Sequence, residues 1–568
     1  MIHGRQKTVN FRTNHMILKE LTELYSGIYL DRRAFLGNIN YWGVLTRHWT
    51  DVGALSPVAK RGEAMNVMIV SPEAVPFAKT GGLADVAGAL PKYLGKLGVN
   101  ASLVMPLYPN VAQSGVKLTK LAPVVRVPIG DKVFEGALWQ SVIPDSQTPV
   151  YFIDQKDFYN RPELYSVKGK DYPDNCQRFL FLCRATLELI KALGLEVDVL
   201  HANDWQTGLI PVYIKTLYAK DPAIGGIATL FTVHNLAYQG LFWHWDMPLT
   251  GLSWDLFNWT ELEFYGKLSL LKGGLTFSDA INTVSKQYAK EIQTEEYGCG
   301  LEGVLTQRRD SLFGVVNGVD YSVWNPEVDT LIPAKFSMRD LSGKARCKAQ
   351  LQKSQKLPER SDTPLIGCIS RLVDQKGFDL LVEILDELLG QDVQMVLLGT
   401  GEPKYNRIFP EMAKKYPTKL AVSVAFDNQL AHLIEAGSDM YLMPSAFEPC
   451  GLNQIYSLKY GTVPVVRETG GLKDTIVNVT DETLARGTAT GFSFRAYKSA
   501  ALLETLKRAM AFYTQKSGWS RLVQNCMKQD WSWERSGREY VDVYRWAMEH
   551  RAKRNKNARK SQEKIGSK

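Results

Sequence analysis

Strand-length apolar runs alternate with helical stretches along most of this chain, and the alternation occurs twice. Runs such as 66–70 are almost entirely apolar, which is typical of strands buried on both faces. This order predicts an α/β protein whose mostly parallel sheets carry helices on both faces. The expected strands are 66–70, 101–105, 150–154, 197–201, 229–234 and 280–284 in the first set, and 365–370, 394–399, 420–426, 440–444 and 463–466 in the second.

The break between the two sets indicates a hinge at residues 313–326. A chain of 568 residues is too long for one hydrophobic core, so two large domains are expected. Ligands of doubly wound sheets bind beyond the carboxyl ends of the strands, and the chemistry should therefore lie in the loops that follow them. The expected segments are an N-terminal extension of unknown role (1–64), a first domain (65–312), a second domain (313–525), a last helix (526–550) and a basic, disordered tail (551–568).

The net charge of +9 is concentrated at the two ends of the chain. Eight basic residues and one acidic residue give 551–568 a charge of +7, nine basic against five acidic residues give 1–64 a charge of +4, and 65–550 is left with −2. A nearly neutral body argues against a nucleic-acid-binding domain. No run approaches the ~20 apolar residues of a membrane helix. The seven cysteines include no Cys-x-x-Cys pair, which suits a reducing compartment and predicts neither disulfides nor a zinc site.

Two glycines follow the first expected strand, in Lys79-Thr-Gly81-Gly82-Leu-Ala-Asp85. Glycine lets the backbone approach a ligand closely, and the free N–H groups of the next helix attract anions. Lys79 adds a positive charge at the same place. The motif predicts a ligand-binding loop, although an ordinary glycine-rich turn fits it equally well.

Polar residues follow two later strands of the first domain. His201-Ala-Asn-Asp-Trp follows one apolar run, and His234-Asn235 follows the next. A single histidine at a strand end is more often structural than catalytic. Because polar clusters occur at two successive strand ends, we expect His201 at the edge of the site, as part of a sugar-binding wall.

Charged side chains and glycines follow strands of the second domain. Arg371 and Lys376 follow its first strand, where a guanidinium and an ammonium could clamp a diphosphate; a solvated basic turn is the alternative. Glu448 follows a later strand, and its carboxylate either stabilises an oxocarbenium-like transition state or stabilises the start of a helix. Thr469-Gly470-Gly471 comes before another helix and suits phosphate.

Two common motifs are absent from the sequence. Gly399-Thr-Gly401 lacks the third glycine of G-x-G-x-x-G, which argues against a dinucleotide-dependent dehydrogenase. There is also no Asp-x-Asp pair to hold a divalent metal on a diphosphate. We therefore expect no metal, with Lys79, Arg371, Lys376 and helix dipoles neutralising the phosphates.

In this order, the motifs resemble those of bacterial glycogen synthases and plant starch synthases, which form glycosyltransferase family 5. The resemblance runs from Met65 to about Glu549. It implies the GT-B fold, in which two doubly wound Rossmann-like domains face a central cleft. It also implies retaining transfer of glucose from ADP-glucose to the non-reducing end of an α-1,4-glucan, without a metal or other cofactor. The motifs are Lys79-Thr-Gly-Gly-Leu-Ala-Asp85, His201-Ala-Asn-Asp-Trp, Thr232-Val-His-Asn-Leu-Ala-Tyr-Gln-Gly240, Ser370-Arg-Leu-Val-Asp-Gln-Lys-Gly377, Glu448-Pro-Cys-Gly-Leu and Thr469-Gly-Gly-Leu472.

The resemblance further implies roles for the matched segments and residues. The first domain would be the catalytic, acceptor-side domain, the second would bind the nucleotide sugar, and a helix near 533–548 would cross back to the first. His201 would lie near the glucose C6 hydroxyl, Arg371 and Lys376 would neutralise the departing diphosphate, and Glu448 would stabilise positive charge on the sugar. The implied substrate-binding residues are Lys79, Gly81, Gly82, Asp85, Asn235, Phe426, Thr469, Gly470 and Gly471.

Three positions depart from the family pattern. Phe426 stands where the family often places a tyrosine against adenine, so a polar contact there is in doubt. Asn203 stands where His-Ala-His is commoner, and Tyr456 stands where the wider clan often has a second glutamate, eight residues after Glu448.

Two other functions compete with this interpretation. One is a GT-B transferase that uses UDP-glucose, and the other is a catalytically inactive, glucan-binding homologue. The second is disfavoured because Lys79, Arg371, Lys376 and Glu448 are all present. We expect a cytoplasmic bacterial enzyme, with a plastid as the alternative because of residues 1–64. The expected partners are a nucleotide-sugar donor and an α-glucan acceptor, without nucleic acid or membrane; the sequence leaves the oligomeric state open.

Overall fold

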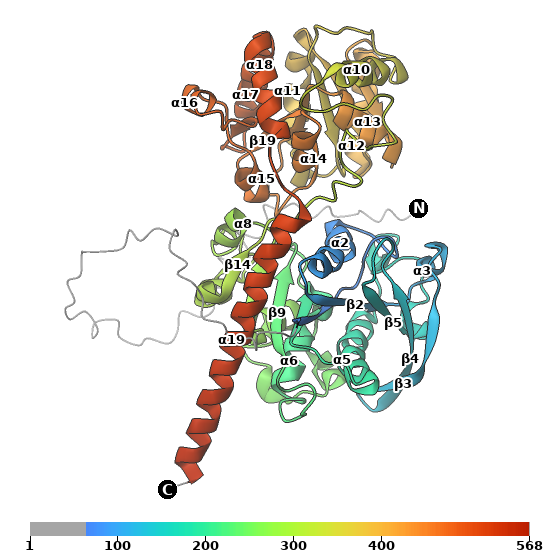
Figure 1. The fold of residues 1–568 in the computed structure, drawn as a ribbon, viewed down its shortest axis with the longest axis vertical. Coiled ribbons are helices and arrows are strands. Elements are labelled where there is room, and N and C mark those ends of the chain that lie inside the picture. The colour runs from blue at the N-terminus through green and yellow to red at the C-terminus, as the bar shows by residue number, and fades with distance from the viewer. Residues whose placement is uncertain (1–63, 567–568) are drawn as a thin grey trace, which may run out of the picture. The chain divides into compact units, whose positions relative to one another are not determined.

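The computed structural model of the protein describes residues 64–566, so the expected extension lies outside the described residues except for its last position. The first domain contains a nine-stranded sheet in the order β14-β13-β9-β8-β1-β2-β5-β4-β3 (Figure 1). Neighbours from β14 to β5 pair in parallel, and β4 and β3 continue the sheet in antiparallel fashion. The strands are β1 (Asn66–Val70), β2 (Asn100–Pro106), β3 (Thr119–Ile129), β4 (Lys132–Val142), β5 (Pro149–Asp154), β8 (Val199–Asn203), β9 (Ala228–Val233), β13 (Ala280–Thr283) and β14 (Leu312–Gly314).

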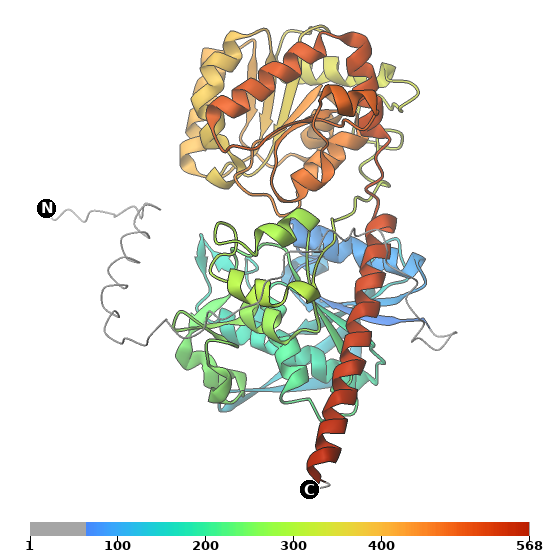
Figure 2. The same cartoon turned by 90° about the vertical axis from the view of Figure 1, so that its left-hand side faces the viewer.

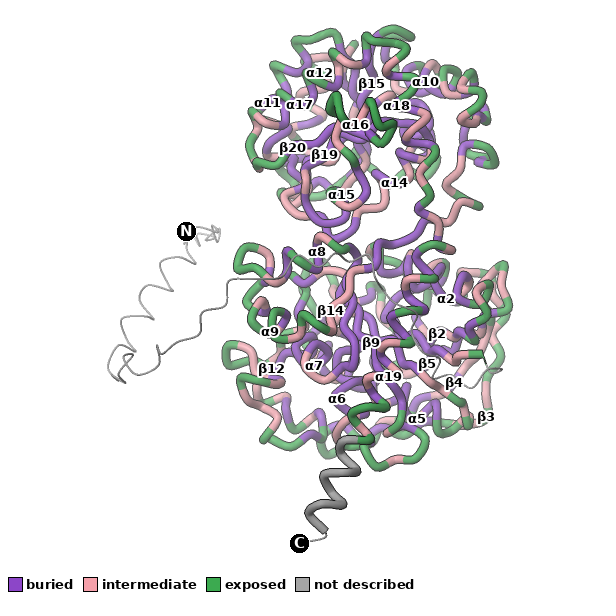
Figure 3. Tube along the Cα trace, turned by 60° about the vertical axis from the view of Figure 1, so that its left-hand side comes forward, coloured by how far each residue is buried: buried purple, intermediate pink, exposed green. Residues whose placement is uncertain are grey.

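The second domain contains a six-stranded sheet in the order β17-β16-β15-β18-β19-β20, in which all neighbours pair in parallel. Its strands are β15 (Leu365–Ile369), β16 (Gln394–Leu398), β17 (Leu420–Ser423), β18 (Met440–Met443), β19 (Val463–Arg467) and β20 (Phe492–Phe494). The central strands are buried along nearly their whole length, as their apolar sequences require (Figure 3).

Helices connect the parallel strands in both domains. In the first domain the principal ones are α2 (Gly82–Lys96), α5 (Asn175–Leu193), α6 (Leu209–Lys215), α7 (Leu270–Phe277), α8 (Lys286–Glu291) and α9 (Glu302–Gln307). In the second they are α10 (Ser342–Ser354), α11 (Phe378–Gly390), α12 (Pro403–Lys415), α13 (Asn428–Gly437), α14 (Asn453–Lys459), α15 (Gly470–Thr475), α16 (Asp481–Ala485), α17 (Ser499–Tyr513) and α18 (Lys516–Met527). Two doubly wound α/β domains confirm the predicted fold class.

The last helix, α19 (Trp533–Gly566), packs on the first domain although it follows the second in the sequence (Figures 1 and 2). It contacts β8, β9, β13 and α2. Trp533, Tyr540, Tyr544 and Ala547 are buried in the same core as the first sheet. The first domain is therefore assembled from two segments that are far apart in the sequence.

The expected disordered tail at 551–568 is wrong for residues 551–566, because α19 continues to Gly566. No glycine or proline interrupts residues 538–565, and lysine, arginine, alanine, glutamate and glutamine favour helix. Arg551 also donates to the backbone oxygen of Gly225, and Arg554 contacts Asp279 at 3.5 Å. The basic charge of this segment led to the prediction of disorder, whereas its residues have good helix propensity and its first turns contact the first domain.

Candidate active site

The loop after β1 is organised by a buried carboxylate. Glu73 is 2% exposed and accepts hydrogen bonds from the backbone N and Oγ1 of Thr80, both at 2.6 Å. Burial raises the pKa of Glu73. Gly81 precedes the first residue of α2, and Gly82 begins this helix. Glu73 thus fixes the loop that carries the predicted ligand-binding glycines, a role that the sequence reasoning missed.

Lys79 and Asp85 face each other across this loop. Lys79 Nζ lies 2.7 Å from Asp85 Oδ1, and both side chains are partly exposed. A ligand phosphate would compete with Asp85 for the ammonium. The structure thus brings the predicted residues Lys79, Gly81, Gly82 and Asp85 together at the carboxyl end of β1.

His201 does not lie at a strand end, contrary to the prediction. It is the middle residue of β8 and is completely buried. Nδ1 contacts the hydroxyl of Tyr544 at 3.0 Å, and Nε2 contacts Oγ1 of Thr232 at 2.7 Å. Burial lowers the pKa of His201 to about 3. Both ring nitrogens therefore contact protein partners under α19, and the contact of His201 with the sugar stays a prediction.

The carboxyl end of β8 instead presents Asp204, beside the half-buried His234. Asp204 Oδ1 accepts a hydrogen bond from the backbone N of His234 at 2.7 Å, and His234 Nε2 lies 2.9 Å from Oδ1 of Asn203. Burial raises the pKa of Asp204 to about 7 and lowers that of His234 to about 3. Asp204 has φ +56°, an uncommon conformation for a residue other than glycine. Asn235, predicted to bind substrate, is half-buried next to this group.

In the second domain, the structure brings Lys376 and Glu448 into direct contact. Lys376 Nζ lies 2.6 Å from Glu448 Oε2, which also accepts a hydrogen bond from Ser445 Oγ at 3.0 Å. Glu448 is 6% exposed. Gly377 has φ +77°, and a Cβ there would lie 2.1 Å from the carbonyl oxygen of Pro444. Glycine is therefore required where the loop after β15 packs against the loop after β18.

Arg371 is exposed in the loop after β15, and among residues 64–556 no carboxylate lies within ion-pair distance of it. Phe426, predicted to contact the base, is 91% exposed after β17. Tyr456 stacks on Trp324 with ring centroids 4.1 Å apart and an interplanar angle of 2°. This packing uses the ring of Tyr456, which stands in place of a second glutamate.

The Thr469-Gly470-Gly471 loop contacts a protein carboxylate. The backbone N of Gly470 donates to both carboxylate oxygens of Glu291 at 3.0 Å, and Oγ1 of Thr469 donates to it at 3.3 Å. A Cβ on Gly470 would lie 2.0 Å from the backbone oxygen of Glu448, and one on Gly471 would lie 2.0 Å from that of Cys450. Close packing of backbones thus accounts for both glycines.

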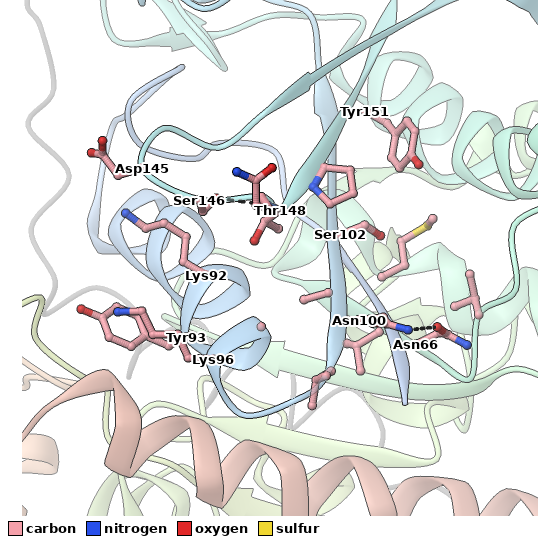
Figure 4. A pocket seen from close by; sticks show the side chains of 18 of the residues that line it. Asn66, Lys92, Tyr93, Lys96, Asn100, Ser102, Asp145, Ser146, Thr148 and Tyr151 are labelled. Carbon is pink, nitrogen blue, oxygen red and sulfur yellow. Dashed lines mark hydrogen bonds between the residues drawn. The ribbon is translucent and has the colours of Figure 1, made fainter. Parts of the chain in front are cut away.

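A cavity lies at the amino-terminal ends of β1 and β2, opposite the strand ends that carry the predicted site residues (Figure 4). Its volume is about 850 Å³. Asn66 and Asn100, which begin β1 and β2, line it together with Lys92 and Tyr93 of α2. Because the predicted site residues of this domain follow the carboxyl ends of β1, β8 and β9, this cavity is separate from the candidate active site.

Other site types receive no support from the described residues. Among residues 64–556, no three histidine, cysteine, aspartate or glutamate side chains are grouped as metal ligands. No helix described in that range is long and apolar enough to cross a membrane.

Comparison with known proteins identifies the family. The model for the starch synthase catalytic domain matches residues 66–307, and that for glycosyl transferases group 1 matches 350–516. Glycogen synthase 1 of Geobacter metallireducens is 46% identical over 499 residues, which cover 87% of this chain and 99% of the relative. Glycogen synthase of Thermosipho africanus is 47% identical over 494 residues, covering 86% and 100%. The chain belongs to the glycogen and starch synthase family.

A solved member of this family has the same fold. The catalytic domain of starch synthase IV from Arabidopsis thaliana, bound to ADP and acarbose, matches with a TM-score of 0.79 and 32% identity. The match covers 86% of this chain and 100% of that one. Sucrose-phosphate synthase from Thermosynechococcus elongatus, at 15% identity and a TM-score of 0.53, supports the fold alone. The predicted GT-B fold and the predicted glycosyltransferase class are thus confirmed.

Proposed function

We propose that the protein transfers glucose from ADP-glucose to the non-reducing end of an α-1,4-glucan, with retention of the anomeric configuration. The observation that carries this proposal is the contact between Lys376 and Glu448 in the second domain. It places one ammonium and one buried carboxylate together at the carboxyl edge of a doubly wound sheet. The ADP and acarbose bound to the Arabidopsis thaliana starch synthase are consistent with a nucleotide-sugar donor and a glucan acceptor.

Charge neutralisation is the first task of the site. In our proposal Arg371 and Lys376 bind the diphosphate, because a guanidinium offers two parallel donors and an ammonium offers a compact charge. Lys79 and the Gly81–Gly82 loop contribute from the first domain, where Lys79 exchanges Asp85 for a phosphate oxygen. Phe426 is proposed to lie against the base. These cations remove the need for a metal ion.

Bond exchange at the sugar is the second task. The bond between glucose C1 and the diphosphate oxygen breaks, and the acceptor O4 forms the new bond to C1 on the same face. The proton of the acceptor hydroxyl passes to the departing diphosphate. Glu448 stabilises the positive charge that develops on the sugar. We assign the contact with the sugar in the first domain to His234, Asp204 and Asn235, in place of His201.

A label-transfer assay tests the proposal. The full-length protein is incubated with glycogen and either ADP-[¹⁴C]glucose or UDP-[¹⁴C]glucose, with and without EDTA. We expect label in glycogen with the ADP donor, at a rate that EDTA leaves unchanged. Preference for UDP-glucose would favour the alternative donor, no transfer with either donor would favour an inactive homologue, and loss with EDTA that Mg²⁺ restores would contradict the metal-free site.

The seven free cysteines, six of them buried, favour a reducing compartment. With bacterial glycogen synthases as relatives, we place the enzyme in the bacterial cytoplasm.

A further inference from the structure

Three exposed tryptophans form a cluster on the first domain. They lie on β10 (Leu241–Trp243) and on the 3-10 turns η3 (His244–Thr250) and η4 (Trp254–Leu256). Trp243, Trp245 and Trp254 are 64%, 57% and 44% exposed. The ring centroids of Trp243 and Trp245 are 6.4 Å apart, and those of Trp245 and Trp254 are 5.6 Å apart. We call these three residues the tryptophan platform.

The backbone beneath the platform is well fixed. Met247 and Thr250 of η3 are completely buried. Thr250 Oγ1 donates to the backbone oxygen of Met247 at 2.6 Å, and Tyr213 Oη donates to the backbone oxygen of Thr250 at 3.0 Å. Trp254 also packs on Phe257 with ring centroids 5.6 Å apart. A ligand would therefore meet a preformed set of rings, and its binding would cost little ordering entropy.

The platform is continuous with the candidate active site. Strand β10 begins directly after the loop that runs from His234 to Gly240. Gly240 has φ +58°, and a Cβ there would lie 2.4 Å from the ring of Trp205. The ring of Trp205 in turn packs on Phe242 with centroids 5.7 Å apart. One aromatic contact thus joins the turn next to Asp204 to the strand that ends in Trp243.

The charge around the platform restricts the ligand. Residues 241–267 contain four carboxylates and a single basic residue, Lys267, which pairs with Trp243 across β10 and β12. Nucleic acids, whose bases also stack on aromatic rings, require basic residues for their phosphates, and anionic membranes require them for their head groups. An uncharged polyol has no such requirement. Indole faces pack against the apolar C–H faces of pyranose rings, while Asp246, Asp255 and His244 can hydrogen-bond to hydroxyl groups.

We propose that the tryptophan platform is a second binding site for an α-glucan, which holds the polymer while one of its chain ends reacts elsewhere. The proposal rests on the proposed function for the identity of the polymer. Binding several sugar units of one molecule at two places raises the effective concentration of chain ends at the active site. The platform should therefore matter for a polymer and not for a short acceptor.

The test uses the full-length Trp243→Ala/Trp245→Ala variant. The matched control is Trp259→Ala, because Trp259 is 79% exposed on the same segment and has no aromatic ring packed on it among the described residues. Glycogen binding is measured without donor, by retardation in native gels that contain glycogen. We expect the dissociation constant of the double variant to rise about tenfold, because two stacked rings are lost. The control should match the wild type.

Kinetics separate the platform from the active site. For the double variant, KM for glycogen should rise about tenfold, while kcat and KM for maltotriose stay at wild-type values. If the proposed function itself were wrong, the wild type would transfer glucose to neither acceptor. The platform proposal would still hold in that case if glycogen retarded the wild type in the gel and did not retard the double variant. The platform proposal would be overturned if glycogen retarded the double variant as strongly as the wild type. It would also be overturned if Trp259→Ala lost as much affinity for glycogen as the double variant.

A measurement on the unmodified protein completes the test. Maltoheptaose should protect Trp243 and Trp245 from oxidation by N-bromosuccinimide, read by mass spectrometry of peptides, and should leave Trp259 unprotected. Equal oxidation with and without the sugar would overturn the proposal. Analytical sedimentation tests whether a second copy of the chain occupies the platform instead. If the wild type self-associated and the double variant were monomeric, the platform would be an interface between copies, and the glucan-binding proposal would be overturned.

Discussion

At the scale of residues, the part of the site on the second domain pairs one buried carboxylate, Glu448, with a lysine, where many sugar-processing enzymes use two carboxylates. Glycosidases that form a covalent intermediate place two carboxyl groups about 5 Å apart across the bond. Here Glu448 is paired with Lys376, and the ring of Tyr456 is stacked on Trp324. Within the described residues, no second carboxylate contacts the pair. An electrostatic role for Glu448 follows more naturally than a nucleophilic one.

Glu448→Gln tests this role, because it keeps the shape and removes the charge. An electrostatic group that acts mainly in the transition state should lower kcat when it is lost, by about 10²-fold or more. The affinity for ADP should change little, since Arg371 and Lys376 remain. Glu482→Gln, on an exposed helix, is the control. Steady-state kinetics with ADP-glucose and glycogen give kcat; a near-normal value for Glu448→Gln, or a glucosyl ester trapped on Glu448, would contradict the proposal.

Two histidine variants distinguish a structural role for His201 from a role for His234 in contact with the substrate. His201→Ala removes a fully buried ring and leaves Tyr544 Oη and Thr232 Oγ1 without their partner, so it should cost about 2–4 kcal/mol of stability. The kcat of the folded enzyme should stay within a few-fold of wild type. His234→Ala should show the opposite pattern, a loss of kcat without a comparable loss of stability. Urea unfolding and kinetics on both variants measure this; equal loss of kcat would restore a direct role for His201.

The pH dependence of stability provides a second readout of His201. Its pKa falls from 6.5 in the unfolded chain to about 3 in the folded protein, so only the unfolded state takes up its proton between these values. The contribution of His201 to stability is therefore complete above pH 6.5 and decreases by about 1.4 kcal/mol per pH unit below it. We expect the difference in unfolding free energy between wild type and His201→Gln to shrink by about 1.6 kcal/mol from pH 6.5 to pH 5. A constant difference would show that His201 titrates normally.

At the scale of elements, the sequence predicts strands well and their ends less well. The predicted strand 197–201 became β8 at Val199–Asn203, and this shift of two residues moved His201 from the strand end to its middle. The apolar run alone could not show that Asn203 also pairs, nor that tyrosines from α19 cover this strand. β3 and β4 were missed because their alternating exposed residues lack a continuous apolar run. Contacts within one loop, such as Glu73 with Thr80, and between loops, such as Lys376 with Glu448, depend on loop conformation and need the structure.

Two truncations test the role of α19. Deleting 528–568 removes Trp533, Tyr540, Tyr544 and Ala547 from the core of the first domain. Burial of each large side chain contributes about 1.5–3 kcal/mol, so the loss is comparable to the whole stability of a domain. We expect this truncated protein to aggregate or to lose the cooperative unfolding transition. Deleting only 557–568 should leave unfolding and activity close to wild type, and a folded, active product of the longer deletion would contradict this account.

At the scale of the whole molecule, helices of the two domains cap each other. Glu291 at the end of α8 binds the N-terminus of α15, and Asp474 of α15 accepts a hydrogen bond from the backbone N of Gln287 in α8 at 2.8 Å. Negative charges at helix N-termini stabilise by about 0.3–1 kcal/mol each. Two such contacts are weak enough to exchange for ligand contacts, because binding of a diphosphate by several cations contributes more than this.

The last prediction concerns closure on the donor. The proposed diphosphate ligands belong to different domains, Lys79 to the first and Arg371 with Lys376 to the second, so a bound nucleotide that touches both gains affinity only when the domains approach. We expect saturating ADP to decrease the radius of gyration in small-angle X-ray scattering. Lys79→Ala should make this decrease smaller, although ADP still binds to the second domain. The control Lys132→Ala, in the exposed β3–β4 hairpin, should show the same decrease as the wild type. A radius that is unchanged by saturating ADP would count against a hinge at residues 313–326 and against the shared diphosphate site.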